Sequence, residues 1–182
     1  MTEAQLSNAM DAYGSTVYRL ALTRMQNIAD AEDVYQEVFL RLWKQAAEDW
    51  DGDRAKAWLI RTTLNRCADL HRFRLRRPVL SFAEIPDLAQ PEDESRELWE
   101  AVSRLPEKAR TAVHLYYAEG YSAEEISQLM HIPAATVRTR LHRARKQLKE
   151  LLGGIDDETC VSRSDGTCLL YTSPSPRDLS TS

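Results

Sequence analysis

Apolar residues recur at helical spacing through most of this chain, and that spacing is the strongest constraint on its fold. It runs from about Gln5 to Leu75 and again from about Glu94 to Leu152, and strand-like alternation is absent from both stretches. The stretch between them, RPVLSFAEIPDLAQPEDES, holds three prolines and many acids, as a linker does. The sequence therefore predicts an all-α protein, with two small helical domains joined by a flexible acidic linker.

We place the domain boundaries where the composition changes. The N-terminal helical domain is expected over residues 1–77, the linker over 78–93, and the C-terminal domain over 94–154, where two glycines follow the last helical stretch. Residues 155–182 are rich in serine, threonine and proline and lack an apolar period, which predicts a disordered tail. Its last part, CLLYTSPSPRDLSTS, looks like translated cloning sequence, so we expect the tail to be partly non-native.

Charge is clustered in this chain, although the net charge is only -4. Residues 54–77 hold eight Lys/Arg against one acid, and residues 133–152 hold six against one. Residues 78–100 hold seven acids against one base. Clustered positive charge favours a nucleic-acid partner, whatever the total. A single basic block would more simply be a solvated helix face, so the prediction depends on the motifs inside the blocks.

The segment YSAEEISQLMHIPAATVRTRLHRARKQL predicts two helices with a short turn between them. Ser122 and Glu125 have the spacing of a capping box, so the first helix is expected to begin at Ala123. Pro133 follows the break and suits the first position of the next helix, where its missing N–H is no loss. This arrangement is typical of a helix-turn-helix DNA-binding domain, whose second helix lies in the major groove.

That second helix has an apolar face and an opposite basic face, at about 100° per residue. The apolar face holds Val137, Leu141, Ala144, Leu148, Leu151 and Leu152. The opposite face holds Arg138, Thr139, His142, Arg143 and Lys146, with Arg140 and Arg145 on the flanks. Arginine can bond guanine through two N–H groups, and flanking arginines would lie near phosphates. The pattern predicts a DNA-recognition helix; taken alone, it also fits a basic amphipathic helix of no special function.

In the first region, Asp30 is expected to cap a helix from Ala31 to about Ala46. Its apolar residues cover about half of the helix circumference. They are Val34, Tyr35, Val38, Phe39, Leu42 and Trp43. Leu40 lies on the other side, among Asp33, Gln36, Glu37 and Lys44. A leucine ringed by polar groups indicates a protein interface, although a core helix with one surface leucine fits about as well.

Asp53 is expected to cap the next helix, RAKAWLIRTTLNRCADLHRF, whose two faces differ in kind. One face holds Arg54, Trp58, Arg61, Asn65, Asp69 and Arg72, and the other holds Ile60, Leu64 and Cys67. Arginines, an amide and an aromatic ring suit single-stranded nucleic acid, because cations follow the backbone and planar groups engage unstacked bases. For Trp58 alone, packing in the core is the commoner outcome.

Together these motifs resemble a bacterial RNA polymerase sigma factor of the extracytoplasmic-function (ECF) class of the sigma-70 family. DAEDVYQEVFLRLWKQ resembles that family's helix for binding the core polymerase clamp. AWLIRTTLNRCADLHR resembles its promoter-melting and minus-ten-recognising segment, and the stretch from Leu105 to Leu152 resembles its minus-thirty-five-recognising domain. The resemblance implies a protein that binds core RNA polymerase and directs promoter recognition and DNA melting for transcription initiation.

The resemblance also implies roles for particular residues. Core polymerase would contact Asp33, Gln36, Glu37 and Leu40. Melted minus-ten DNA would contact Trp58, Arg61, Asn65 and Arg72, with Asn65 helping to hold a flipped base. Duplex minus-thirty-five DNA would contact Arg138, Thr139, Arg140, His142 and Arg143. Ala134 and Ala135 stand where the family often has a small residue followed by glycine, which is a mild departure from its pattern.

Two other classes of protein are alternatives to a sigma factor. A helix-turn-helix transcriptional regulator that does not associate with core polymerase explains the second region, but not the Trp/Asn/Arg face of the first. An enzyme is not expected, because the four histidines, His71, His114, His131 and His142, lack metal-ligand spacing to a cysteine or carboxylate, and no glycine-rich phosphate loop occurs. No cofactor, metal or small-molecule substrate is therefore expected, whereas the family makes an anti-sigma factor a plausible further partner.

The expected location is the cytoplasm. Cys67, Cys160 and Cys168 form no disulfide framework and no metal-spaced pair. No apolar run approaches the roughly 18 residues that span a bilayer. The first residues, MTEAQLSNAMD, lack the basic start and apolar core of a secretory signal. A reducing compartment is the simplest interpretation.

Overall fold

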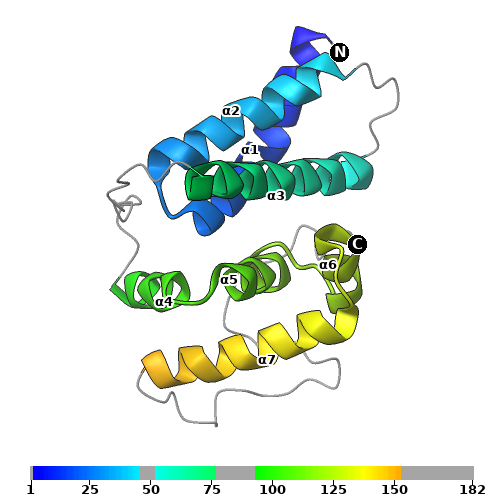
Figure 1. Ribbon diagram of the computed structural model, residues 1–182. Coiled ribbons are helices and arrows are strands. Elements are labelled where there is room, and N and C mark those ends of the chain that lie inside the picture. Colours follow the sequence, from blue (N-terminus) through cyan, green and yellow to red (C-terminus); the bar gives the residue numbers. More distant parts are fainter. Residues whose placement is uncertain (1, 46–51, 77–92, 153–182) are drawn as a thin grey trace, which may run out of the picture. The chain divides into compact units, whose positions relative to one another are not determined.

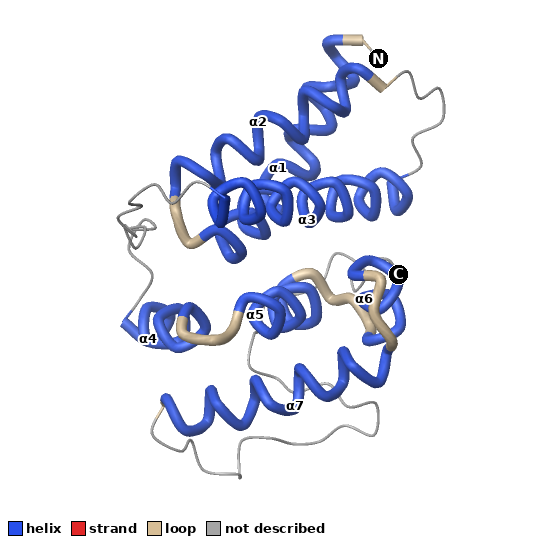
Figure 2. The backbone as a smooth tube through the Cα atoms, in the orientation of Figure 1, coloured by secondary structure: helices blue, strands red, loops and turns tan. Residues whose placement is uncertain are grey.

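The computed structural model describes residues 2–45, 52–76 and 93–152. Within these ranges the regular structure is entirely helical, without a strand (Figure 2). The chain divides into two compact units, one built on the first three helices and the other on the later ones. The all-α prediction is therefore confirmed. The predicted linker, except for Asp93, and the predicted tail lie outside the described residues.

In the described residues of the first unit, three helices pack against one another (Figure 1). They are α1 (Glu3–Met25), α2 (Ile28–Lys44) and α3 (Gly52–Arg76), and each contacts the other two. Every one of them contributes side chains that are almost completely buried, because the apolar residues repeat at helical spacing. These include Val17 and Leu20 of α1, Val34, Val38 and Leu42 of α2, and Leu59, Ile60 and Cys67 of α3.

The start of α2 differs from the prediction that Asp30 caps this helix. The cap is Asn27, which has an extended backbone and whose side-chain oxygen accepts from the Asp30 backbone N–H at 2.9 Å. Asp30 lies in the first turn instead, where it is buried and forms an ion pair with Arg74 of α3. Burial raises the pKa of the Asp30 carboxyl above its ordinary value, and the Arg74 guanidinium opposes that shift. Asp30 thus joins two helices rather than beginning one.

The start of α3 also differs from the sequence prediction, which placed the first helical residue at Arg54, two residues later than it is. The helix begins at Gly52, so Asp53 lies in the first turn and does not cap it. An acid there still suits the positive end of the helix dipole. The carbonyl of Gly52 accepts a hydrogen bond of 3.1 Å from the Tyr13 hydroxyl of α1, which ties the beginning of α3 to its neighbour.

The second unit contains four α-helices and one π-helical turn within the part of the chain that is described. They are α4 (Asp93–Ser103), α5 (Glu107–Val113), the π-helical turn η1 (His114–Ala118), α6 (Ala123–Met130) and α7 (Ala134–Leu151). Helices α4 and α5 both contact α7. Leu105, Leu115, Ile126, Val137 and Leu141 are buried and form the apolar core of this unit.

A buried arginine holds the junction between α4 and α5. One terminal nitrogen of Arg110 donates to the carbonyl of Ser103 at 2.7 Å and to the carbonyl of Leu105 at 3.1 Å. The residue is only 5% exposed. Carbonyls at a helix end lack partners within the helix, and this guanidinium supplies a donor to two of them.

Arg110→Ala is expected to destabilise the second unit by about 3 kcal/mol, because two charge-assisted hydrogen bonds are lost and two carbonyls are left without their donor. Hydrogen exchange of α7 amides in the full chain measures this as roughly a 100-fold loss of protection. Arg104→Ala is the matched control, since Arg104 is exposed near the same junction. Equal protection in the two variants would contradict the role of Arg110.

Candidate nucleic-acid and polymerase interfaces

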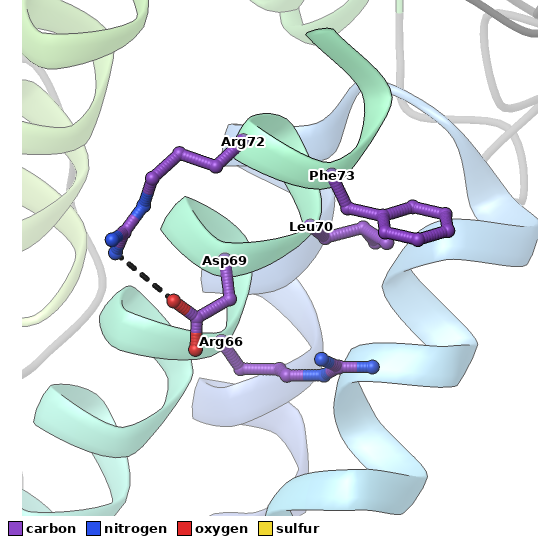
Figure 3. Close-up of a pocket in the computed structure, with 5 residues that line it drawn as sticks. All are labelled: Arg66, Asp69, Leu70, Arg72 and Phe73. Atoms are coloured by element: carbon purple, nitrogen blue, oxygen red, sulfur yellow. Dashed lines mark hydrogen bonds and ion pairs between the residues drawn. The ribbon is translucent and has the colours of Figure 1, made fainter. Parts of the chain in front are cut away.

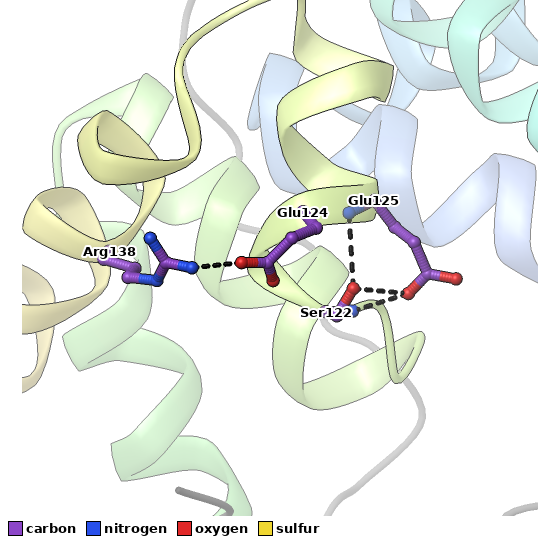
Figure 4. A network of polar contacts seen from close by, with 4 residues as sticks. All are labelled: Ser122, Glu124, Glu125 and Arg138. Carbon is purple, nitrogen blue, oxygen red and sulfur yellow. Dashed lines mark hydrogen bonds and ion pairs between the residues drawn. The ribbon is translucent and has the colours of Figure 1, made fainter.

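The turn between α6 and α7 follows the predicted helix-turn-helix pattern closely. The Ser122 backbone N–H donates to Glu125 Oε2 at 2.8 Å, and the Glu125 backbone N–H donates to Ser122 Oγ at 3.3 Å (Figure 4). This reciprocal pair confirms the predicted capping box, and α6 begins at Ala123 as expected. His131 then takes a left-handed backbone with φ 52°, which stops α6.

Pro133 is the N-cap residue of α7, whereas the sequence predicted that it would be the first residue of this helix. Its carbonyl accepts from the backbone N–H of Thr136 at 2.9 Å and of Val137 at 3.2 Å, and the helix begins at Ala134. The proline lies one position earlier because its ψ of 141° is extended rather than helical. The break in the chain was thus located correctly, and only the helix boundary moved.

The two faces of α7 are separated as the helical wheel predicted. Val137, Leu141 and Ala144 are buried in the core of the second unit. The apolar face weakens toward the end of the helix, where Leu148 is half-buried and Leu151 is exposed. On the opposite face the side chains are exposed: Arg138, Thr139, His142, Arg143 and Lys146. Arg140 is half-buried, in keeping with a flank position.

Two side chains at the beginning of α7 already have partners. Arg138 forms an ion pair with Glu124 in the first turn of α6 (Figure 4). The Thr139 hydroxyl donates to the Ala135 carbonyl at 2.9 Å, one turn back in the same helix. The sequence pattern did not predict the ion pair, because its two residues are 14 positions apart and join across the turn.

The cationic face of α3 is also present as predicted. Arg61, Asn65 and Arg72 are exposed, whereas Trp58 is half-buried and so lies between the surface and the core. Arg72 is paired with Asp69 one turn back at 2.9 Å. The side opposite to this face is buried at Ile60, Leu64 and Cys67. The arrangement presents donors and an amide side by side along a single helix.

A feature that the sequence analysis missed lies at the end of the same helix. Phe73 is 55% exposed and lies beside Leu70, and the two side chains point away from the Arg72–Asp69 pair (Figure 3). Together with Arg66, Asp69 and Arg72 they line an open hollow on the surface of α3. A wheel drawn through to Phe73 places it close to Arg66, seven residues earlier, and that signal was available.

The predicted polymerase face of α2 is exposed around its leucine. Leu40 is 53% exposed, with Asp33 and Gln36 exposed along the same side of the helix. Glu37 is half-buried and pairs with Arg41 at 2.9 Å. The exposed position of Leu40 within a polar surface is the one that the helical wheel predicted.

Trp43 departs from the prediction that it belongs to the buried face of α2. It is 42% exposed and lies three residues after Leu40, in the last turn of the helix. Residues three apart are neighbours on a helix surface. Trp43 therefore adds a large apolar side chain to the surface around Leu40, which is wider than the sequence indicated.

Three further observations concern metal ions, cysteine and membranes in the part of the chain that is described. No group of His, Cys, Asp and Glu there could hold a metal ion. Cys67 is buried and does not form a disulfide bond. A search of the described helices finds none that is long and apolar enough to cross a membrane.

Comparison with known proteins gives matches over both units. The family model for Sigma-70 region 2 matches residues 9–77, and the model for Sigma-70, region 4 matches residues 95–148. The ECF RNA polymerase sigma factor SigE of Mycolicibacterium smegmatis is 34% identical over 161 residues, covering 82% of this chain. The match spans 62% of the length of that relative.

A second relative and a solved structure match over almost their whole length. The ECF RNA polymerase sigma factor SigM of Bacillus subtilis is 32% identical over 155 residues, which are 80% of this chain and 94% of SigM. The sigma factor RpoE, solved in complex with the anti-sigma factor NepR from Bartonella quintana, has the same fold, with a TM-score of 0.70 and 24% identity. The likeness covers 84% of this chain and 99% of RpoE. By these sequence matches, the chain belongs to the ECF family of RNA polymerase sigma factors.

Proposed function

We propose that this protein is the promoter-recognising subunit of a bacterial RNA polymerase. It binds core polymerase through α2, holds melted minus-ten DNA on α3, and recognises duplex minus-thirty-five DNA with α7. The observation that carries the proposal is the presence in one chain of two exposed basic helix faces, on α3 and α7, and of the apolar-centred surface around Leu40. Membership of the sigma factor family supports the same assignment.

The proposed division of labour follows the domain boundaries expected from the sequence. Residues 1–77 would bind polymerase and open the minus-ten element, residues 94–154 would bind the minus-thirty-five element, and residues 78–93 would set their spacing. The protein contributes binding and not bond chemistry, so it is not an enzyme in this proposal, and polymerase makes the RNA. It would act in the cytoplasm, where polymerase and promoter DNA are.

An anti-sigma factor is a further proposed partner. The RpoE structure, which shares this fold, was solved with an anti-sigma factor bound to it. Such a partner would have to cover α2 or one of the two basic faces, because these are the surfaces on which the proposed activity depends. Its identity would follow from co-purification with the full chain.

Reconstitution with core RNA polymerase tests the proposed function. The full chain is expected to co-elute with the core enzyme in a one-to-one complex and to start transcription from particular genomic sites. Sequencing the transcripts would then define the promoter elements. A helix-turn-helix regulator would bind DNA alone and would not co-elute with polymerase, and this result would replace the proposal by that alternative.

Substitution of two arginines of α7 is expected to affect DNA binding in different ways. Arg143 is exposed on the face that would enter the major groove, so Arg143→Ala should cost about 1–3 kcal/mol at the true minus-thirty-five element and much less on scrambled DNA. Arg140 is half-buried on the flank, where phosphates run, so Arg140→Ala should weaken both duplexes alike. It should also reduce the slope of log affinity against log salt concentration by about one unit, because one phosphate contact is lost.

Fluorescence anisotropy on both duplexes across a salt series measures these effects. Lys146→Ala is a control, because Lys146 is exposed on the same face one turn further from the beginning of the helix. Equal losses on specific and scrambled DNA for Arg143→Ala would show that α7 is an electrostatic anchor and not a recognition helix.

A further inference from the structure

Two neighbouring glutamates in the first turn of α6 have different tasks. Glu125 turns back to Ser122 and completes the capping box. Glu124 does not take part in that box; its carboxylate accepts from a terminal nitrogen of Arg138 on α7 (Figure 4). The side chains of Arg138 and Glu124 are 60% and 59% exposed. The ion pair therefore lies on the surface and joins the two helices of the motif across their turn.

The Glu124–Arg138 ion pair contributes little to the stability of the fold. Exposed ion pairs contribute about 0–1 kcal/mol, because water screens the charges and two long side chains must be ordered. An acid in the first turn of a helix adds a similarly small dipole term. The helices are already held by the buried side chains of Ile126, Val137 and Leu141. A role in holding the fold accounts for little of what Glu124 does here.

The position of the pair has a larger consequence for DNA binding. Arg138 lies near the beginning of α7, the end of a recognition helix that contacts base edges. A carboxylate beside it lowers the positive charge facing the DNA and repels phosphates. Attraction to phosphates is independent of sequence, so Glu124 weakens binding to every duplex by the same mechanism.

The same contact leaves Arg138 able to recognise a base. A guanidinium carries five N–H donors, and the ion pair engages one terminal nitrogen. Recognition of guanine needs two of the donors in a fixed geometry. A side chain held on one edge loses less rotational freedom on binding than a free one does. The carboxylate thus orients the arginine for base contact while it reduces the arginine's general attraction to DNA.

We propose that Glu124 is a specificity-determining residue, which positions Arg138 for a base contact and suppresses binding to non-promoter DNA. This inference rests on the proposed function, because it needs α7 to face the minus-thirty-five element. Glu124 itself acts through Arg138 and through its charge.

Three substitutions separate the charge of Glu124 from its position. Glu124→Gln removes the charge and keeps the size, so affinity for scrambled duplex should rise about 3- to 10-fold, with a salt slope larger by up to about one unit. Glu124→Asp keeps the charge on a shorter side chain that no longer reaches Arg138 in the same geometry. Its affinity for scrambled duplex should stay near that of the wild type, while its preference for the promoter falls about 10-fold. Glu150→Gln is the matched control, since Glu150 is an exposed acid at the far end of α7.

The measurement is anisotropy of polymerase reconstituted with each full-length variant, on a promoter duplex and on one with a scrambled minus-thirty-five element. In an Arg138→Ala background, the change to Asp should no longer alter the promoter preference. The idea is overturned if Glu124→Gln and Glu150→Gln shift both duplexes equally, or if Glu124→Asp keeps full preference. If the wild type itself fails to bind polymerase or to distinguish the duplexes, the proposed function fails first, and the role of Glu124 falls with it.

Discussion

Gln36→Ala combined with Leu40→Ala should weaken binding to core polymerase by at least about 30-fold. Leu40 is the exposed apolar centre of the α2 surface, and Gln36 lies one turn before it. A few central side chains carry most of the free energy of an interface, with truncation costs of about 2 kcal/mol or more. The fold should be unaffected, because neither side chain is part of the core.

Binding is measured by titrating labelled core polymerase with each variant in the absence of DNA. Phe73→Ala is the matched control, because Phe73 is as exposed as Leu40 but lies on α3. The control should bind polymerase as the wild type does. Wild-type affinity in the double variant would remove α2 from the polymerase interface, and loss of affinity in Phe73→Ala alone would move that interface to α3.

Asn65→Ala should reduce formation of the open promoter complex by about 10- to 100-fold, while binding of a fully duplex minus-thirty-five fragment stays unchanged. Asn65 is exposed on α3 between Arg61 and Arg72, where its amide can both donate to and accept from a base edge. Unstacking a base costs a few kcal/mol, which contacts to the extruded base must offset. A bidentate contact of that kind contributes about 1–3 kcal/mol.

Permanganate footprinting of thymines in the promoter bubble measures the opened state directly. Asn65→Asp provides a second variant, because it keeps the size but loses the amide donor and adds a charge near the DNA backbone; it should be at least as defective. Unchanged thymine reactivity in Asn65→Ala would rule out a role for this side chain in holding melted DNA.

The helices and their buried faces could be predicted because apolar spacing is a local property. Val34, Val38 and Leu42 are buried where the wheel placed them, and so are Val137 and Leu141. The capping box at Ser122 was equally visible, since both of its partners lie within one turn. Features of this kind depend on a few neighbouring residues and not on the rest of the chain.

Features that depend on distant partners could not be predicted in the same way. Asn27 and Asp30 are both good capping residues. Asn27 is the cap, because Asp30 instead forms an ion pair with an arginine 44 residues later. The pairing of Glu124 with Arg138 likewise requires the turn between α6 and α7 to be formed. The exposure of Trp43 depends on which neighbouring helix covers it, and a wheel drawn for one helix contains no such information.

The Asp30–Arg74 pair has a consequence for how promoter opening would be aligned with polymerase. It joins the first turn of α2, the helix proposed to bind polymerase, to the last part of α3, next to Arg72 and Phe73. A change in the tilt of α2 would therefore act directly on the end of α3 through this contact, and not only through the chain between the helices. The orientation in which α2 binds polymerase would then also fix the orientation of the α3 surface that holds the separated strand. Binding of polymerase and binding of melted DNA would thus be aligned by the same contact.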